Sequence, residues 1–230
     1  RAAKGEWLVF TDADTRHHPD CIAVAVALAR RRRADLLSFW PGQVTGSMAE
    51  RLVIPLVHIL ILGFLPQWLL GLFQACPGVA KRLPRTWLGS LGAANGQFLL
   101  FRRAAYFAVG GHAAVRDHLV EDVGLARLIA ARAGEGMRLA NLDGTGLVEC
   151  RMYENAAQVW EGFTKNLRPA FGRNTGTFFF SLAVQFLIFL WPFVAWAVPG
   201  GDPGLALAGA GLVYGIRFFL AAMFRTSLLG

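Results

Sequence analysis

Gly5-Glu-Trp-Leu-Val-Phe-Thr-Asp-Ala-Asp14 is the stretch of sequence that decides the fold. Residues 7–10 form a short apolar run, which predicts a buried strand. The strand ends at two carboxylates, Asp12 and Asp14, which stand one residue apart on a turn. Such a pair can reach one hard divalent cation. Because Asp is also a favoured turn residue, a solvated acidic turn is the alternative interpretation.

The residues after this stretch predict an α/β unit. Pro19 opens a helix of about residues 19–33, which closes with arginines at 30–33 that suit the negative end of a helix dipole. Residues 35–40 follow as a second strand. A strand, a helix and a strand in this order indicate a βαβ unit in a parallel sheet.

Further elements follow along the chain. The pattern predicts a strand at 96–101, helices at 103–109, 121–132 and 155–168, and candidate edge strands at 137–140 and 145–150. The helix at 121–132 opens with Glu121 and Asp122, for which ordinary helix capping is the alternative to a catalytic role. The helix at 155–168 is amphipathic, which fits a helix lying in a membrane interface.

The composition favours a domain joined to a membrane anchor, because 55% of the 230 residues are hydrophobic and 17% are charged. Residues 176–198 carry no charge and residues 205–224 are broken only by Arg217, so we predict two transmembrane spans there. Arg168, Arg173 and Arg225 flank the spans, whereas the linker between them has no Lys or Arg. This bias predicts a multi-pass protein of the cell (inner) membrane with its catalytic domain in the cytoplasm.

Residues 52–73 are also long and apolar, but they contain Pro55 and Pro66. A single crossing here would put Asp12 and Asp122 on opposite sides of the bilayer. We therefore predict an interfacial or re-entrant helical insertion at about 47–85, broken near 63–66, with a buried core helix as the alternative.

The net charge of +8 comes largely from basic runs beside hydrophobic segments (30–33, 81–85 and 165–173). We expect these runs to face lipid head groups rather than nucleic acid. The odd, widely spaced Cys21, Cys76 and Cys150 predict neither a disulfide framework nor a zinc site. The sequence gives no indication of the oligomeric state.

In order and spacing, these segments resemble the GT-A glycosyltransferases of family 2. The resemblance rests on the opening stretch, on Gly92-Ala-Ala-Asn95-Gly-Gln-Phe-Leu-Leu-Phe-Arg102-Arg103, and on Glu121-Asp122, and it covers most of residues 1–172. It implies an α/β, GT-A (Rossmann-like) nucleotide-sugar transferase domain, followed by a C-terminal transmembrane helical hairpin. The family's first βαβ unit should precede Arg1, so we expect the domain to be N-terminally incomplete.

The resemblance also implies roles for single residues. Asp12 and Asp14 would hold Mn²⁺ or Mg²⁺ on the diphosphate of a nucleotide sugar donor. Arg151 would contact the same diphosphate, with a plain surface charge as the alternative. Asp122 would be the general base, assisted by Glu121 in positioning the acceptor. The predicted acceptor-binding residues are Asn95, Gly96, Gln97, His118 and Trp160.

Arg151-Met-Tyr153 and the segment 159–166 are most similar to lipid-modifying members of the family, notably carotenoid glucosyltransferases. We predict a partial catalytic domain at 1–172 and a transmembrane region at 173–230. The predicted reaction is inverting, metal-dependent transfer of a hexose, for example from UDP-glucose, to the hydroxyl of a membrane lipid such as a carotenoid or hopanoid. The alternatives are a polyprenyl-phosphate glycosyltransferase and a non-catalytic membrane scaffold.

Overall fold

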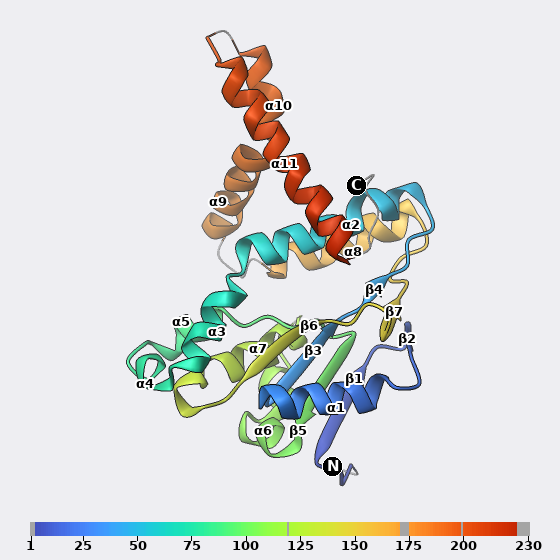
Figure 1. The fold of residues 1–230 in the computed structure, drawn as a ribbon, viewed down its shortest axis with the longest axis vertical. Helices are drawn as coiled ribbons and strands as arrows, with labels where there is room; N and C mark the ends of the chain where they lie inside the picture. Colours follow the sequence, from blue (N-terminus) through green and yellow to red (C-terminus); the bar gives the residue numbers. More distant parts are fainter. Residues whose placement is uncertain (1–2, 119, 171–174, 199, 225–230) are drawn as a thin grey trace.

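The computed structural model describes residues 3–118, 120–170, 175–198 and 200–224, with the side chains of 57–64, 166–170, 177 and 197 left out. A mixed α/β domain occupies one half of the molecule, and apolar helices project from it in the other half (Figure 1). The layer between the two halves consists of two long helices that lie side by side, α2 (Met48–Phe64) and α8 (Ala156–Ala170).

The main sheet has four strands in the order β1-β5-β3-β6. They are β1 (Trp7–Thr11), β3 (Leu36–Trp40), β5 (Phe98–Arg102) and β6 (Leu139–Asp143). The predicted parallel βαβ sheet was wrong in one respect, because β5 pairs antiparallel with both β1 and β3 and separates them. The chain passes from β1 through α1 (Cys21–Arg32) to β3 and leaves room for one strand between them. That place is filled by β5, which lies far along the chain.

A second, three-stranded sheet has the order β2-β7-β4. Its strands are β2 (Thr15–His17), β4 (Gly42–Gln43) and β7 (Val148–Cys150). The strand predicted at 145–150 is therefore central rather than an edge strand, since β7 pairs antiparallel with β2 and parallel with β4. Because β2 follows β1 directly, the Asp12–Asp14 turn joins the two sheets.

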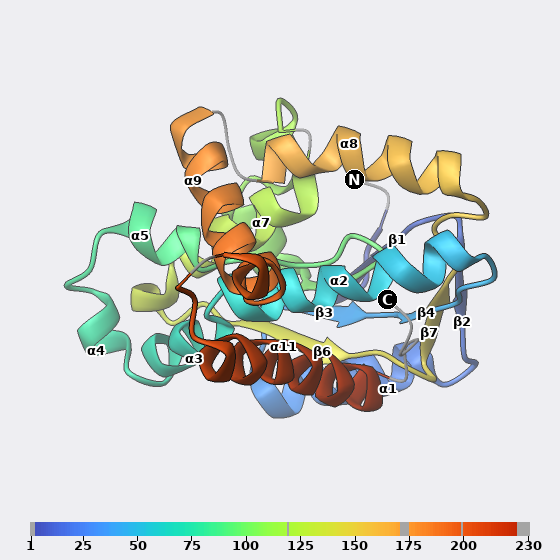
Figure 2. The ribbon, with the colours of Figure 1, turned by 90° about the horizontal axis from the view of Figure 1, so that it is seen from above.

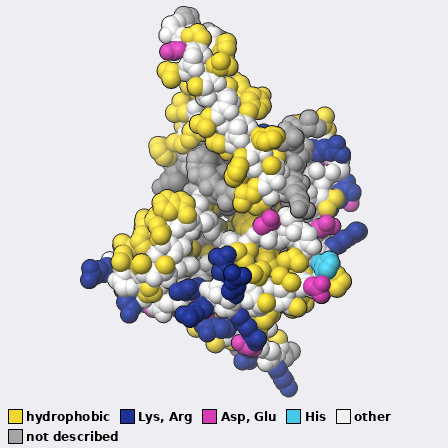
Figure 3. Space-filling view, viewed as in Figure 1, with side chains coloured by type: hydrophobic (Ala, Val, Ile, Leu, Met, Phe, Trp, Pro, Cys, Tyr) yellow, Lys and Arg dark blue, Asp and Glu magenta, His cyan; other side chains and the backbone are white. Residues whose placement is uncertain are grey.

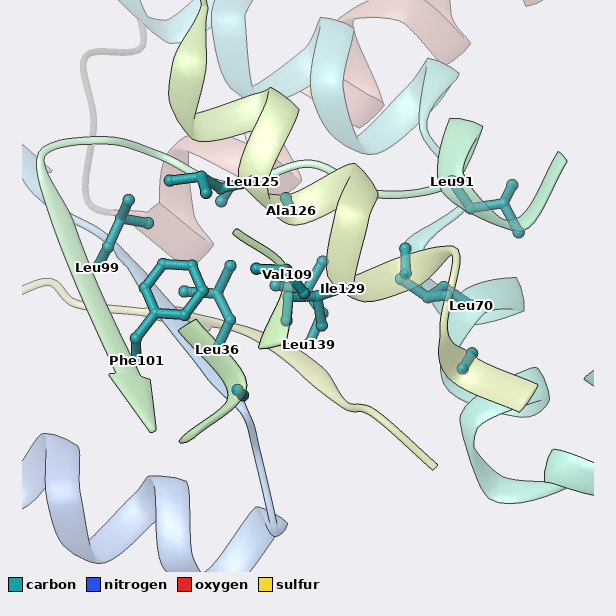
Figure 4. Packing of buried hydrophobic residues seen from close by; sticks show 14 of the residues in the cluster. Leu36, Leu70, Leu91, Leu99, Phe101, Val109, Leu125, Ala126, Ile129 and Leu139 are labelled. Carbon is teal, nitrogen blue, oxygen red and sulfur yellow. The ribbon is translucent and has the colours of Figure 1, made fainter. Parts of the chain in front are cut away.

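Alternating side chains of the main sheet form two cores. On β5, Phe98 and Leu100 pack with the α1 face, whereas Leu99 and Phe101 pack on the opposite face against α7 (Glu121–Ala130). This alternation follows from the two-residue period of a strand. Figure 4 shows the second core, in which Leu36 and Phe101 lie against Leu125, Ala126 and Ile129.

Short helices complete the domain around α7. They are α3 (Gln67–Ala75), α4 (Pro77–Ala80), α5 (Arg85–Ser90), α6 (Arg103–Ala108) and 3-10 turns at Gly111–Val115 and Ala133–Glu135. The predicted break in the apolar insertion is confirmed, since α2 (Met48–Phe64) ends just before Pro66 and α3 begins at Gln67. Helix α8 (Ala156–Ala170) packs alongside α2 (Figures 1 and 2).

A capping box starts α2. The Ser47 hydroxyl accepts the Glu50 amide at 3.4 Å, and Glu50 in return accepts the Ser47 and Gly46 amides at 2.8 Å. Glu50 is fully buried and lies 3.6 Å from Arg151 Nε. Although burial opposes ionisation, the hydrogen bonds from Ser47 and Gly46 and the charge of Arg151 lower the pKa of Glu50 to about 2.

Glu50→Gln is expected to lower the free energy of unfolding by about 2 kcal/mol, because two charge-assisted hydrogen bonds are lost or weakened. The folded-state pKa lies below the unfolded value, so this stabilisation is present above the ordinary glutamate range and is lost as the pH falls through about 2. Thermal unfolding at several pH values measures both effects. Glu149→Gln is the control, since Glu149 is exposed on β7. An unchanged stability of Glu50→Gln would contradict the capping role.

The helices after α8 are apolar. They comprise α9 (Thr175–Gln185), a π-helical segment at Phe186–Leu190, α10 (Trp191–Val194), a 3-10 turn at Ala195–Ala197 and α11 (Pro203–Phe224). Among the described helices, α11 is long and apolar enough to cross a membrane, and Phe178–Val194 is a shorter apolar stretch. Arg173 and Arg225, used to predict the orientation, and the side chain of Arg168 lie outside the described residues.

The basic run at 30–33, predicted to face lipid head groups, lies away from α11. Its arginines are exposed at the C-terminal end of α1, in the half of the molecule away from α11. Figure 3 shows Lys and Arg side chains gathered over that half, whereas hydrophobic side chains cover the projecting helices. Arg32, however, lines a hollow together with Leu70 and Gly71 of α3, so the run lies beside part of the apolar insertion, and its contact with lipid stays a prediction.

Candidate active site

The Asp12–Asp14 turn lies at the carboxyl end of β1. Thr15 holds it, donating from its hydroxyl to the Asp12 carbonyl at 2.7 Å, and the Thr11 hydroxyl donates to the Gln97 carbonyl at 3.0 Å. Desolvation, and the neighbouring charges of Asp14 and Glu121, raise the pKa of Asp12. Both acids are exposed. The turn therefore presents two carboxylates whose repulsion is not relieved by any ion pair among the described side chains.

The start of β5 meets this turn because β5 runs antiparallel to β1. Asn95, Gly96 and Gln97 precede the strand and so stand at the same edge of the sheet as Asp12 and Asp14. The Gly96 amide donates to Asp122 Oδ2 at 2.7 Å, and the Val123 amide donates to Oδ1 at 2.7 Å. These bonds fix the carboxylate at the N-terminus of α7 against the strand.

Asp122 is partly buried, and burial raises its pKa. The charges of Glu121 and Asp12 raise it further, and the two amide hydrogen bonds act in the opposite direction. Charge interactions link Asp12 to Asp14, Glu121 and Asp122, and we call these four carboxylates the acidic cluster. The structure thus brings together the predicted metal ligands Asp12 and Asp14, the predicted general base Asp122, and Glu121, which was predicted to help position the acceptor.

Two further residues, which the sequence prediction missed as site residues, support this cluster. Cys150 on β7 lies opposite Thr15 of β2, close enough to Asp14 for the charge of that carboxylate to act on the thiol. Burial, and then the charge of Asp14, raise the pKa of Cys150 to about 12, so the thiol stays protonated. Burial and the charge of Asp14 also raise the pKa of Tyr153. Only the pairing of β7 with β2 places these residues beside the turn, and no local sequence signal indicates it.

Gln97 connects these parts. Its side chain is buried and donates from Nε2 to Cys150 Sγ at 2.9 Å, while its Oε1 accepts Gln43 Nε2 at 3.1 Å and Asn95 Nδ2 at 3.3 Å. Asn95 Oδ1 accepts the Gln97 amide at 3.0 Å. Of the predicted acceptor-binding residues, Gly96 therefore hydrogen-bonds to Asp122, and Gln97 hydrogen-bonds to Asn95 and Cys150.

The other predicted site residues lie at varying distances from the cluster. His118 is exposed, and its ring lies beside Gly124 in the first turn of α7. Arg151 is paired with buried Glu50 and lies over Gly46, so its charge is used at the start of α2. Trp160 is 77% exposed on α8. The structure brings His118 to the helix of Asp122 and leaves Arg151 and Trp160 outside the acidic cluster.

The donor set fits a hard divalent cation. Among the described residues no group of three or more His, Cys, Asp or Glu side chains is arranged to hold a metal ion. Asp12 and Asp14 instead offer carboxylate oxygens on one turn, where the charge of Asp14 acts on Asp12. Mg²⁺ is commonly bound by one or two carboxylates together with substrate phosphates and water. Asp12 and Asp14 could therefore supply two of the ligands of such a cation.

Gly96→Ala is expected to slow the predicted sugar transfer about 10-fold, because a small displacement of the predicted base Asp122 lowers the rate steeply. A Cβ at Gly96 would stand 3.1 Å from Asp122 Oδ2 and 3.3 Å from its Cβ, so the carboxylate must shift. Initial rates measure the loss. Gly71→Ala on α3 is the control, since a Cβ there meets nothing within 4 Å. Equal rates in the two variants would contradict the positioning of Asp122 by Gly96.

Comparison with known proteins gives a single finding. No curated protein and no solved structure matches the chain significantly. The model of the family described as Glycosyl transferase family 2 matches residues 1–107. The match includes β1, the Asp12–Asp14 turn and β5, and ends before Asp122. Residues 1–107 are therefore similar to the family 2 glycosyltransferases, and the mixed α/β sheets fit a GT-A domain.

Proposed function

We propose that the protein transfers a hexose from a nucleotide sugar, such as UDP-glucose, to the hydroxyl of a membrane lipid, with inversion at the sugar. The observation that carries the proposal is the acidic cluster, in which the Asp12–Asp14 turn faces Asp122 across the start of β5. Metal-binding carboxylates and a proton acceptor at one sheet edge are what such a displacement requires.

In the proposed mechanism, Asp12 and Asp14 would hold Mn²⁺ or Mg²⁺, and the bound cation would neutralise charge on the leaving diphosphate. The acceptor oxygen forms a bond to the anomeric carbon as the bond from that carbon to the diphosphate oxygen breaks. Asp122 takes the proton of the attacking hydroxyl, and a raised pKa makes it a stronger proton acceptor than an ordinary aspartate. Glu121 helps to position the acceptor. One in-line displacement inverts the anomeric centre.

The lipid acceptor is supported by the layer of helices above the sheet. Exposed apolar side chains on α2 (Met48, Leu52 and Leu56) and Trp160 on α8 form a surface that suits a membrane interface. Helix α11 reaches this layer at its C-terminal end, where it contacts α2. We infer that α2 and α8 lie in the cytoplasmic interface of the inner membrane and admit the acceptor, a carotenoid or hopanoid type of lipid.

Radiolabelled transfer tests this function. The complete protein in membranes is given UDP-glucose labelled in the sugar, Mn²⁺ and a lipid extract, and the labelled lipid is separated by chromatography. We expect label in a lipid that is stable to mild acid, as a glycoside is, and none after chelation of the metal. Label only in an acid-labile lipid phosphate would favour the polyprenyl-phosphate alternative, and no label with any nucleotide sugar would favour the scaffold.

The orientation has its own test, by labelling with a membrane-impermeant thiol reagent. Cysteines replace His118 on the catalytic side and Asp202 between α10 and α11, both exposed, in a background with exposed Cys76 changed to Ser. We expect labelling of the Asp202 position from outside the cell and of the His118 position only after permeabilisation. The same sidedness at both positions would overturn the proposed crossing by α11.

A further inference from the structure

Arg217 is the one charged residue of helix α11 (Pro203–Phe224), and its side chain points into the protein. Arg217 has its Nε and Nη2 buried, with no hydrogen-bond partner among the described residues. The Nε2 atom of Gln185, the last residue of α9, is also buried and has no hydrogen-bond partner among the described residues. All three unpartnered atoms are hydrogen-bond donors.

The packing of the helices puts these donors at one level. A Cβ at Gly209 of α11 would stand 3.1 Å from Pro192 of α10, and the rings of Tyr214 and Phe193 are 5.7 Å apart. These contacts show that the two segments pack together, and Figure 1 shows that they run antiparallel. Gln185 and Arg217 each lie roughly 10–12 Å along their helices from the Pro192–Gly209 crossing, on the side toward the α/β domain.

The residues around Arg217 indicate from which side a ligand could reach its buried guanidinium. Ala221 and Phe224 follow it at helical spacing on the same face of α11, and both are buried. The outer faces of α9, the π-helical segment and α11 are apolar and exposed, as at Phe180, Leu187 and Phe218. A ligand that reaches the donors between these faces must itself carry an apolar part.

We propose that Arg217 and Gln185 form a binding site for the phosphate group of a membrane lipid that enters between α9 and α11. A guanidinium remains protonated, and burying it without a counter-charge is costly. Its planar fork matches phosphate oxygens with paired hydrogen bonds, and the Gln185 amide supplies a further donor. The proposal rests on the membrane placement in the proposed function, but not on sugar transfer.

Native mass spectrometry of the complete protein, released from membranes of phosphatidylglycerol and diacylglycerol, tests the site. We expect retention of phosphatidylglycerol by the wild type and a loss of about 10-fold or more in Arg217→Leu. Arg217→Lys keeps the charge without the fork and should fall between them. Gln185→Glu should also lose the lipid, because the new carboxylate would pair with Arg217. Arg116→Leu is the matched control, since its side chain is 80% exposed on a loop.

Folding is checked by thermal unfolding without lipid, where Arg217→Leu should be at least as stable as the wild type, because an unpaired buried charge is removed. Equal retention by Arg217→Leu and wild type overturns the proposal, as does equal retention of diacylglycerol, which has no phosphate. Displacement of the lipid by inorganic phosphate alone would also overturn a lipid-borne ligand. Arg217-dependent retention in a protein without transferase activity would reject the proposed reaction and leave this site standing.

Discussion

Transfer to a hydroxyl acceptor is expected to fall at least ~100-fold when Asp122 is replaced by Asn. The amide keeps the shape of the carboxylate and can still accept one of the two backbone hydrogen bonds from Gly96 and Val123. It cannot take a proton. The loss should therefore appear in kcat, measured from initial rates at saturating nucleotide sugar, rather than in donor affinity.

The pH dependence gives the Asp122 prediction a second readout. Burial, with the charges of Glu121 and Asp12, raises the pKa of Asp122 above the ordinary aspartate value. The base is ionised above this raised pKa and becomes protonated as the pH falls through it, so the rate should decline on that acid limb. The limb should lie above the ordinary aspartate range in the wild type and vanish in Asp122→Asn, whose rate stays low throughout.

Asp117→Asn is the control for Asp122→Asn, because this nearby carboxylate is 87% exposed. Its rate should match that of the wild type. A normal rate in Asp122→Asn together with a large loss in Glu121→Gln would assign the base to Glu121. Normal rates in both variants would contradict a hydroxyl acceptor, since a phosphate acceptor needs no strong base.

Local features of the fold follow from the sequence, whereas strand order does not. The apolar run before Asp12 gives β1, and the alternation of helix and strand after it gives α1 and β3. The place of β5 between β1 and β3 depends on a segment more than eighty residues away from β1. Periodicity within a window cannot show which strands pair, so the sheet was predicted as parallel and is mixed.

The candidate site divides in the same way. Asp12, Asp14 and Asp122 could be proposed from motif order, because each stands at the end of a predicted strand or the start of a predicted helix. The roles of Cys150 and Gln97 could not, since their hydrogen bond joins β7 to the start of β5. Arg151 was predicted at the diphosphate but lies against Glu50, a partner about a hundred residues earlier in the chain. The partner of a buried carboxylate such as Glu50 depends on three-dimensional neighbours, which the sequence does not show.

Asp14→Ala is expected to lower metal-dependent transfer by about 1,000-fold, since metal stabilisation of a leaving diphosphate contributes several kcal/mol and each 1.4 kcal/mol is a factor of ten. One carboxylate of the pair is removed, and the protein then offers Asp12 alone on the turn. Mn²⁺ titrations of the transfer rate and calorimetric binding of UDP in Mn²⁺ measure the loss. Mn²⁺ with UDP should raise the unfolding temperature of the wild type but not of the variant.

Asp20→Ala is the matched control, because this carboxylate is 75% exposed ahead of α1 and takes no part in the acidic cluster. Unfolding cannot explain the expected loss in Asp14→Ala. The charge of Asp14 raises the pKa of Asp12, so its removal relieves the repulsion between these two carboxylates in the metal-free protein. Asp14→Ala should then unfold no earlier than the wild type without metal. Retained Mn²⁺-dependent binding of UDP by this stable variant would contradict the assignment of Asp14 as a metal ligand.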